Sequence, residues 1–148
     1  MAVMTGNVAQ VFLTDDSWQE NLNAIRRSLH ANGHLVFEVR DPAERAWLDW
    51  NREKTYSLLE IPGIGPVESW CELTDVKSEL VSFRWTYTFK SDGEVITSDS
   101  TLRFRSRAEI ARSLAKSGYR VREVRGAPDR PGKEFVFLQL CPNCSPSE

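Results

Sequence analysis

The chain has 148 residues, of which 41% are hydrophobic and 27% are charged, as in an ordinary globular domain, and its net charge is −2. No apolar run approaches the roughly 20 residues of a membrane helix, which excludes a spanning helix, and we expect no membrane partner. Three cysteines and no export signal favour a reducing compartment, so we expect a cytoplasmic protein of one domain.

The charge is spread unevenly along the chain. Residues 1–100 hold nine Lys or Arg and 16 Asp or Glu, whereas residues 101–133 hold ten and three. A basic block of this kind can bind phosphate or nucleic acid. Aromatic residues do not alternate with these arginines as a base-stacking surface requires, so we interpret the block as solvated surface and expect no nucleic-acid partner.

A short apolar segment opens the chain, and we interpret Ala2–Met4 as a strand with residues 5–7 as its loop. A helix is predicted over 18–32, because apolar residues recur at helical spacing: Trp18, Leu22, Ile25 and Leu29. A Ser17-x-x-Glu20 capping box favours its start, together with the oxygen-bearing side chains at 14–16, and Gly33 is predicted to end it in a left-handed conformation.

His34–Val39 is a short apolar run, typical of a strand buried in a parallel sheet. Asp41 is a suitable N-cap and Pro42 a suitable first residue for a helix that we expect to reach residue 51. These elements predict a β-α-β unit in which helices cover an α/β sheet. Gly63-x-Gly65 has flanking prolines and no strand leading into it, so we do not interpret it as a phosphate loop.

From residue 67 to 106 the apolar residues recur at every second position, which is typical of antiparallel strands. The clearest of them is 81–89, followed by an Asp92-Gly93 hairpin turn and a partner strand over 95–104. Val67–Leu73 is predicted to be a third strand.

A second capping box, Ser106-x-x-Glu109, predicts a further helix, which Gly118 ends. The elements expected after it are strands over 119–124 and 135–140, a loop over 126–132 between them, and a disordered tail over 141–148.

The sequence gives no pattern of a metal site or of a catalytic nucleophile. His30 and His34 lie on either side of a helix end, so they would not share one face. Cys141-x-x-Cys144 is half of a zinc pattern without a second half, and Cys71 offers no suitable spacing. We therefore assign no metal and no catalytic residue, and the role of Cys141 and Cys144 stays open.

Two stretches carry a resemblance to a known family. T-G-N-V-A-Q-V-F-L-T-D-D-S-W over 5–18 and A-I-R-R-S-L-H-A-N-G-H-L-V-F-E-V-R-D-P over 24–42 resemble the C-terminal half of a class I S-adenosylmethionine-dependent methyltransferase. The sheet of that family has the order 3-2-1-4-5-7-6, with strand seven antiparallel. The resemblance covers residues 1–140. It implies a partial Rossmann-like α/β sheet with an antiparallel insert at 67–106, which resembles a flap near the substrate.

The sequence departs from the family at the cofactor motif. The family holds S-adenosylmethionine on a Gly-rich turn after strand one and on an acidic residue after strand two, and neither has a counterpart here. We therefore expect strands four to seven without strands one to three. On this interpretation Met1 is an internal methionine of a longer reading frame, or the edge of a split or decayed gene.

Open α/β sheets bind ligands beyond the carboxyl ends of their strands, and with the resemblance this implies a set of site residues. The implied residues are Thr5, Gly6, Asn7 and Gln10 for the cofactor, and Arg40, Asp41, Trp70 and Trp85 for the substrate. Structural alternatives stay open: Asn7 can cap the following turn, Asp41 can cap a helix, and Arg40 can pair with a surface carboxylate. The two tryptophans can pack in the core or across the hairpin.

Two functions are open. The first is methyl transfer from S-adenosylmethionine to a small-molecule acceptor, by a chain that would need the missing N-terminal half for activity. The second is a non-catalytic half-domain that pairs through the exposed strand Ala2–Met4, as a homodimer or with a complementary half. The sequence does not identify the methyl acceptor.

Overall fold

The computed structural model describes residues 1–141, which form two compact units. The first unit combines Met1–Glu44 with the chain from Arg103 onward, and the second is Arg45–Leu102. The sequence pattern placed the antiparallel segment at 67–106, whereas this second unit begins at Arg45. The tail expected at 141–148 lies, beyond residue 141, outside the described residues.

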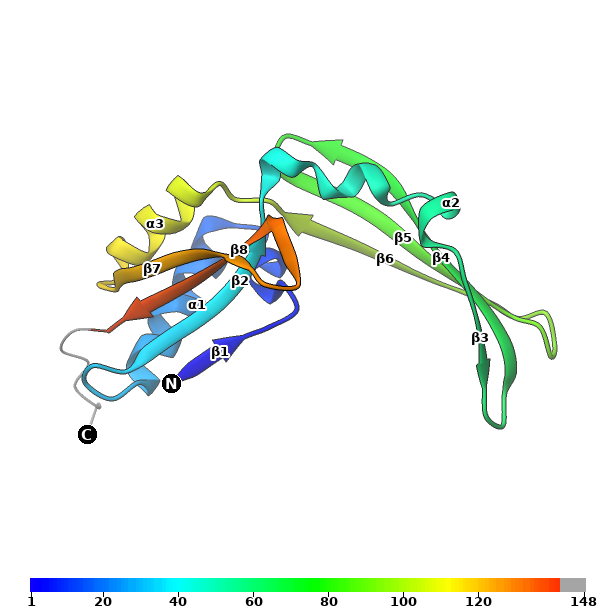
Figure 1. Cartoon of the computed structure of the whole chain (residues 1–148), viewed down its shortest axis with the longest axis horizontal. Coiled ribbons are helices and arrows are strands. Elements are labelled where there is room, and N and C mark those ends of the chain that lie inside the picture. The colour runs from blue at the N-terminus through cyan, green and yellow to red at the C-terminus, as the bar shows by residue number, and fades with distance from the viewer. Residues whose placement is uncertain (142–148) are drawn as a thin grey trace. The chain divides into compact units, whose positions relative to one another are not determined.

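The first unit is built on a four-stranded sheet in the order β1-β2-β8-β7 (Figure 1). The strands are β1 (Ala2–Met4), β2 (His34–Arg40), β7 (Arg120–Ala127) and β8 (Arg130–Leu140). β1 pairs with β2 in parallel, and β8 runs antiparallel to both of its neighbours. The expected α/β class is confirmed. In this order β1, β2, β8 and β7 correspond to strands four, five, seven and six of the family's sheet.

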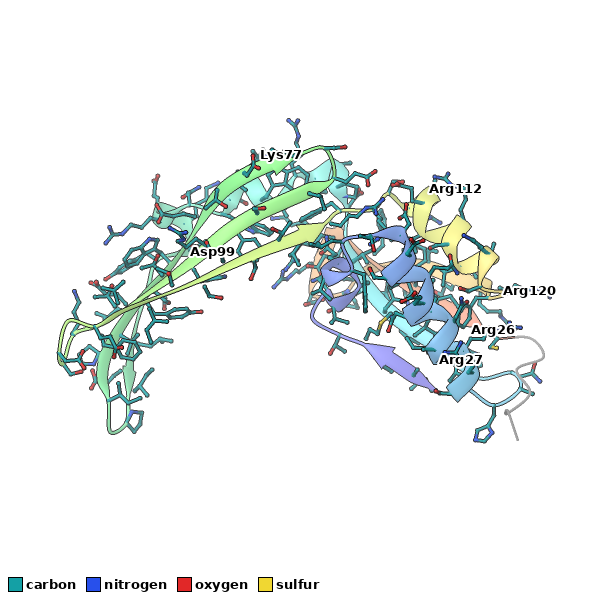
Figure 2. The ribbon with its side chains drawn as sticks, turned by 180° about the vertical axis from the view of Figure 1, so that it is seen from behind. Arg26, Arg27, Lys77, Asp99, Arg112 and Arg120 are labelled. Carbon is teal, nitrogen blue, oxygen red and sulfur yellow. The ribbon has the colours of Figure 1, made fainter. Side chains whose placement is uncertain are left out.

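Two helices, α1 (Asp15–Ser28) and α3 (Arg107–Lys116), cover one face of this sheet, as Figure 2 shows from the helical side. Trp18 packs edge-on against Phe37, which stacks on Phe137 across the β2–β8 pair at 5.4 Å between ring centroids. The indole Nε1 of Trp18 donates to Ser113 Oγ at 2.8 Å, so one side chain joins both helices to the sheet. The core consists of side chains from all these elements, among them Leu22, Leu35, Val39, Ile110 and Leu114.

The ends of α1 differ from the prediction in two details. Thr14 is the N-cap, because its Oγ1 accepts the backbone N–H of Ser17 at 3.1 Å, so the box expected at Ser17 is wrong. After the helix, Asn32 takes the left-handed conformation (φ 60°) that we expected of Gly33. A glycine is needed at position 33 for a steric reason, because a Cβ there would lie 2.8 Å from the carbonyl oxygen of His30.

The start of α3 is as predicted. The Ser106 side chain accepts the backbone N–H of Glu109, and the Glu109 carboxylate accepts the backbone N–H of Ser106 at 2.8 Å. Gly118 follows the helix with φ 74°, which confirms its role as the terminating glycine.

The single helix expected up to residue 51 is wrong. The segment forms two 3₁₀ turns, Pro42–Glu44 and Ala46–Asp49, and then the short helix α2 (Arg52–Thr55). Arg45 lies between the two turns with φ 47°, a left-handed conformation that no helix contains. The capping role of Asp41 is confirmed, because its Oδ1 accepts the backbone N–H of Ala43 at 2.9 Å.

The second unit is a sheet in the order β3-β4-β5-β6. Its strands are β3 (Ser57–Ile61), β4 (Gly65–Lys77), β5 (Leu80–Phe89) and β6 (Val95–Arg103). The hairpin turn at Asp92-Gly93 is confirmed, with Gly93 at φ 77°. The strand β3 was not predicted, since four of its five residues are exposed and it shows no alternation of polar and apolar side chains.

Residues 126–132 are not the loop that we expected. β7 reaches Ala127 and β8 begins at Arg130, which leaves a tight turn between them. This extension of β8 toward its N-terminus brings Glu134 into the sheet. Within residues 1–141, no helix is long and apolar enough to cross a membrane.

Candidate functional site

The polar residues expected at the site converge at one edge of the first sheet. Residues 5–10 follow β1, and Arg40 is the last residue of β2, so both lie at the carboxyl edge of the parallel pair. β8 runs in the opposite direction, and its register places Glu134 directly across from Arg40. A residue from the start of β8 therefore meets residues from the ends of β1 and β2.

Four side chains at this edge, Asn7, Gln10, Arg40 and Glu134, form what we call the strand-end cluster. Asn7 Nδ2 donates to Glu134 Oε1 at 3.2 Å, and Arg40 Nε lies 3.8 Å from the same oxygen. Arg40 Nη1 donates to Gln10 Oε1 at 3.0 Å, and the backbone N–H of Gln10 donates to the Asn7 carbonyl at 3.0 Å. The cluster is thus a closed ring of contacts, to which Arg130 adds a 3.0 Å hydrogen bond to Glu134 Oε1.

Three of the four side chains in the cluster are buried although they are polar, and Arg40 is 20% exposed. Asn7, Gln10 and Glu134 are only 5%, 2% and 4% exposed. Burial lowers the pKa of Arg40, and the charge of Glu134 opposes that shift. A guanidinium stays protonated in proteins, so the pair is an ion pair between a buried carboxylate and a partly buried guanidinium.

Two atoms of the cluster are buried without a hydrogen-bond partner, the carbonyl oxygen Oδ1 of Asn7 and the amide nitrogen Nε2 of Gln10. Leaving such an atom unsatisfied costs about 1–3 kcal/mol, so native structures rarely do so without a reason. One atom accepts and the other donates. The two atoms belong to residues three positions apart in the chain, and both are buried.

The backbone just before the cluster bends sharply. Gly6 and Asn7 both have left-handed φ values, 67° and 59°, and the backbone N–H of Gly6 donates to Glu38 Oε1 at 2.7 Å. A Cβ on Gly6 would meet nothing within 4 Å, so the chain is open on that side. Thr5 contributes its carbonyl oxygen to the turn, accepting the Val8 N–H at 3.4 Å. The Asn7 side chain makes no capping bond, so the alternative of a simple turn cap is wrong.

The substrate residues expected on the second unit do not form one surface. In the β4–β5 register Trp85 lies opposite Cys71, so these two side chains share a face of the sheet. Trp70 is the neighbour of Cys71 and points to the other face, where its Nε1 donates to Glu72 at 2.8 Å and Arg52 lies over its ring at 4.2 Å. Trp85 stacks with Tyr87 at 6.1 Å.

The Lys and Arg side chains of the basic block over 101–133 have several different structural roles. Arg103 and Arg105 pair with Asp15, Arg125 pairs with Glu123, and Arg130 pairs with Glu134. Figure 2 shows Arg112 on α3 and Arg120 on β7. Lys116 lies in the last turn of α3, where the helix dipole favours a cation. Within residues 1–141, no group of three His, Cys, Asp or Glu side chains could hold a metal ion.

Sequence reasoning missed two residues of this edge, Glu134 and Glu38. Glu134 stood at the border between an expected loop and an expected strand, and nothing in the local pattern separates it from a solvated acid. Its role follows only from the register that sets it opposite Arg40. A charged residue next to an apolar run was the one available signal, and it is a weak one.

No protein-family model matches this sequence, and no curated protein matches it significantly. Solved structures do match it. They include an S-adenosylmethionine-dependent methyltransferase from Clostridium acetobutylicum ATCC 824 (TM-score 0.70, 11% identity, 95% of this chain and 57% of that chain). The sugar N-methyltransferase KedS8 from Streptoalloteichus sp ATCC 53650 has a TM-score of 0.70 at 14% identity, over 95% of this chain and 56% of that one.

A third match is CalS10, an amino pentose methyltransferase from Micromonospora echinaspora, solved with S-adenosylmethionine bound. It aligns with a TM-score of 0.65 at 16% identity, over 94% of this chain and 57% of its own. At such identities the similarity shows a shared methyltransferase fold. The chain spans little more than half the length of these structures.

Proposed function

We propose that the chain is the C-terminal part of a class I methyltransferase domain that transfers a methyl group from S-adenosylmethionine to a small-molecule acceptor in the cytoplasm. The observation that carries the proposal is the strand-end cluster. It lies beyond the carboxyl ends of a parallel pair, where open α/β sheets bind ligands, and it holds two buried amide atoms without partners.

The residues present match one end of the cofactor in hydrogen-bonding type. S-adenosylmethionine carries an α-amino-acid group, whose ammonium donates hydrogen bonds and whose carboxylate accepts them. Asn7 Oδ1 and Gln10 Nε2 are an acceptor and a donor of the matching kinds, and both atoms are buried in this structure. The bend at Thr5 and Gly6 leaves the backbone open on the adjacent side. The cofactor supplies an electrophilic methyl group on a sulfonium, so the protein needs only to bind and align the reactants.

The acceptor side of the proposal rests on fewer contacts. Arg40 and Asp41 end β2 at the same edge, although the Asp41 carboxylate also caps the next turn. Trp70 and Trp85 face opposite sides of their sheet, so at most one of them lines an acceptor pocket. The sugar and amino-sugar methyltransferases among the similar structures support a small-molecule acceptor.

We infer further that activity needs a second polypeptide segment. That segment would supply a Gly-rich turn that binds the cofactor and an acidic residue that binds its ribose. The similar structures are nearly twice as long as the aligned region, which supports this inference. The second candidate function, pairing through a free strand edge, is supported by β1. This strand is at the edge of its sheet, and its Val3 side chain is 52% exposed.

Calorimetric titration of the 148-residue chain with S-adenosylmethionine tests the proposal. Binding in the micromolar range supports a methyltransferase site. The absence of binding, both alone and after mixing with an N-terminal half from a similar methyltransferase, would overturn it. Sedimentation at high concentration tests the second candidate, because pairing through β1 predicts a dimer that Val3→Lys abolishes. A chain that stays monomeric would rule out homodimer formation.

A further inference from the structure

A pocket of about 250 Å³ opens between α1 and α3, and its lining shares no residue with the strand-end cluster. Trp18 and Arg105 form its floor: they are 1% and 5% exposed, and the guanidinium lies 5.6 Å from the centre of the indole ring. Gln19 joins the two walls, because its Nε2 donates to the carbonyl oxygen of Ser113 at 3.4 Å. The pocket is therefore a hollow with a fixed floor between two helices.

Four charged side chains in and beside this pocket compensate one another. Asp15 Oδ1 lies 2.9 Å from Arg103 Nη1 and 3.6 Å from Arg105 Nε. Burial lowers the pKa of Arg105, as does the charge of Arg103, whereas the charges of Asp15 and Glu109 raise it. Two acids and two guanidiniums sum to zero, so this group favours neither an anionic nor a cationic ligand.

The remaining charges of the lining are Asp16 on the α1 wall and Arg112 and Lys116 on the α3 wall. In the part of the chain that the structure describes, no ion pair and no side-chain hydrogen bond involves any of these three. Arg112 and Lys116 are four positions apart on one helix, so they share a face and repel each other. The pocket thus has two uncompensated cations on one wall and one uncompensated acid on the other.

The helix dipoles account for only two of these charges. An acid is favoured in the first turn of a helix and a cation in the last, which suits Asp16 on α1 and Lys116 on α3. Arg112 is in the middle of α3, where the dipole gives no such benefit. Its charge beside Lys116 therefore calls for an anion from outside the chain.

A ligand that balances these walls has two anionic groups and one cationic group. A guanidinium binds a carboxylate through two parallel hydrogen bonds, and an ammonium binds one as a point charge. The indole of Trp18 gives the pocket an apolar floor, against which a short carbon chain can pack. Aminodicarboxylates, the class of glutamate and aspartate, combine these groups in a molecule small enough for such a pocket.

Simpler ligands match the lining less well. Phosphate or sulfate would satisfy Arg112 and Lys116, but it has no cationic group for the Asp16 carboxylate, which would repel it. A diamine would meet the opposite difficulty at the α3 wall. The mixture of charges therefore favours a ligand that carries both signs.

We propose that this pocket binds an aminodicarboxylate, with its two carboxylates on Arg112 and Lys116 and its ammonium on Asp16. The site is separate from the proposed methyl-transfer site, because it lies between α1 and α3 and not at the strand-end cluster. All of its residues belong to the first unit.

Titration of the full 148-residue chain with glutamate at low ionic strength tests the proposal, with the backbone amides followed by nuclear magnetic resonance. We expect saturable shifts confined to residues 15–19 and 105–116. Glutarate lacks the ammonium and 4-aminobutyrate lacks one carboxylate, so each loses one charge-assisted contact. Each should bind about tenfold more weakly than glutamate.

Variants of exposed side chains assign the contacts. Arg112→Gln and Lys116→Gln should each weaken glutamate binding by about tenfold. Asp16→Asn should remove the preference for glutamate over glutarate. The matched control is Arg27→Gln, which removes an exposed arginine from the far end of α1, outside the pocket lining (Figure 2). It should leave the affinity unchanged, and the backbone spectra verify that every variant is folded.

Three results would overturn the proposal. The first is a titration in which glutamate causes no saturable shift. The second is a set of shifts spread along both helices that Arg27→Gln weakens as much as Arg112→Gln does, which would mean general screening of positive charge. The third is equal affinity of the parent chain for glutamate and glutarate, which would exclude the contact with Asp16. None of these results bears on S-adenosylmethionine, so the proposed function is decided separately.

Discussion

The side-chain amide of Asn7 and the carboxylate of Glu134 meet at 3.2 Å although 127 residues separate them in the chain. Their contact joins the loop after β1 to the start of β8, across the intervening strand β2. Because β8 is antiparallel to β2, its first residues reach the edge where the parallel strands end. One antiparallel strand thus adds a buried acid to the edge at which the parallel strands end.

Glu134→Ala should destabilise the first unit strongly. It removes a buried carboxylate that pairs with the partly buried Arg40 and with Arg130 and that accepts from the Asn7 amide, and losing these partners costs about 1–3 kcal/mol. Denaturant unfolding followed by tryptophan fluorescence measures the change, since Trp18 lies in the core of this unit. The control Glu123→Ala breaks an exposed pair with Arg125, for which we expect a loss below about 1 kcal/mol. Equal losses in the two variants would mean that burial does not govern the Arg40–Glu134 interaction.

Gly33→Ala should also destabilise the first unit, for a steric reason. An alanine Cβ would lie 2.8 Å from the His30 carbonyl oxygen and 3.0 Å from Leu29 Cβ, so backbone atoms must move. Forced displacements of this kind cost about 1–3 kcal/mol. Gly126→Ala is the matched control, because a Cβ there meets nothing within 4 Å. Its free energy of unfolding should change by less than about 1 kcal/mol. A tolerated Gly33→Ala would show that the turn at 30–33 relaxes easily.

The sequence pattern correctly predicted those elements that are specified by residues close together in the chain. Three of these signals depend on residues within a few positions of each other: the helical spacing of Trp18 and Leu22, the Ser106 capping box and the Asp92-Gly93 turn. All three are found in the structure. The helix expected after Asp41 failed because apolar spacing cannot reveal that Arg45 adopts a left-handed conformation. The spacing of apolar residues predicts a helix correctly only when every residue within it adopts the helical backbone conformation.

The candidate site was only partly predictable, and for a different reason. Asn7, Gln10 and Arg40 lie at or just after the ends of two identified strands, and the family resemblance assigned them to a ligand site there. Glu134 does not, because its position depends on strand register across a long sequence separation. Register also decides that Trp70 and Trp85 face apart, which no alternation within a single strand can show.

Ser106→Ala should weaken the start of α3. The Ser106 hydroxyl accepts the Glu109 backbone N–H at 3.3 Å and donates to the Glu109 carboxylate at 2.6 Å, and alanine makes neither bond. Loss of an N-cap side chain costs about 1 kcal/mol. Chemical denaturation measures it, with Ser98→Ala on the exposed part of β6 as the control that should change little. An unchanged midpoint for Ser106→Ala would mean that the Glu109 half of the capping box suffices.

Tyr119 should make the stability of the first unit fall at alkaline pH. Its side chain is 5% exposed and its hydroxyl donates to the Leu22 carbonyl oxygen at 3.1 Å. Burial raises its pKa from the ordinary 10.0 to about 12, so the folded state binds the phenolic proton more tightly than the unfolded state. The resulting stabilisation is complete below pH 10.0 and is lost as the pH rises through 10.0 toward about 12. A difference of this size corresponds to about 2–3 kcal/mol.

Tyr119→Phe isolates this contribution. The variant loses the hydrogen bond to Leu22 and should be about 1 kcal/mol less stable than the parent at neutral pH. Above pH 10 the difference should shrink and then reverse, because phenylalanine has no proton to lose. Urea unfolding of both proteins at a series of pH values gives the two curves, and the lysines titrate alike in both and cancel from the difference. Parallel curves up to the highest pH would show that the Tyr119 hydroxyl ionises as easily in the folded chain as in the unfolded one.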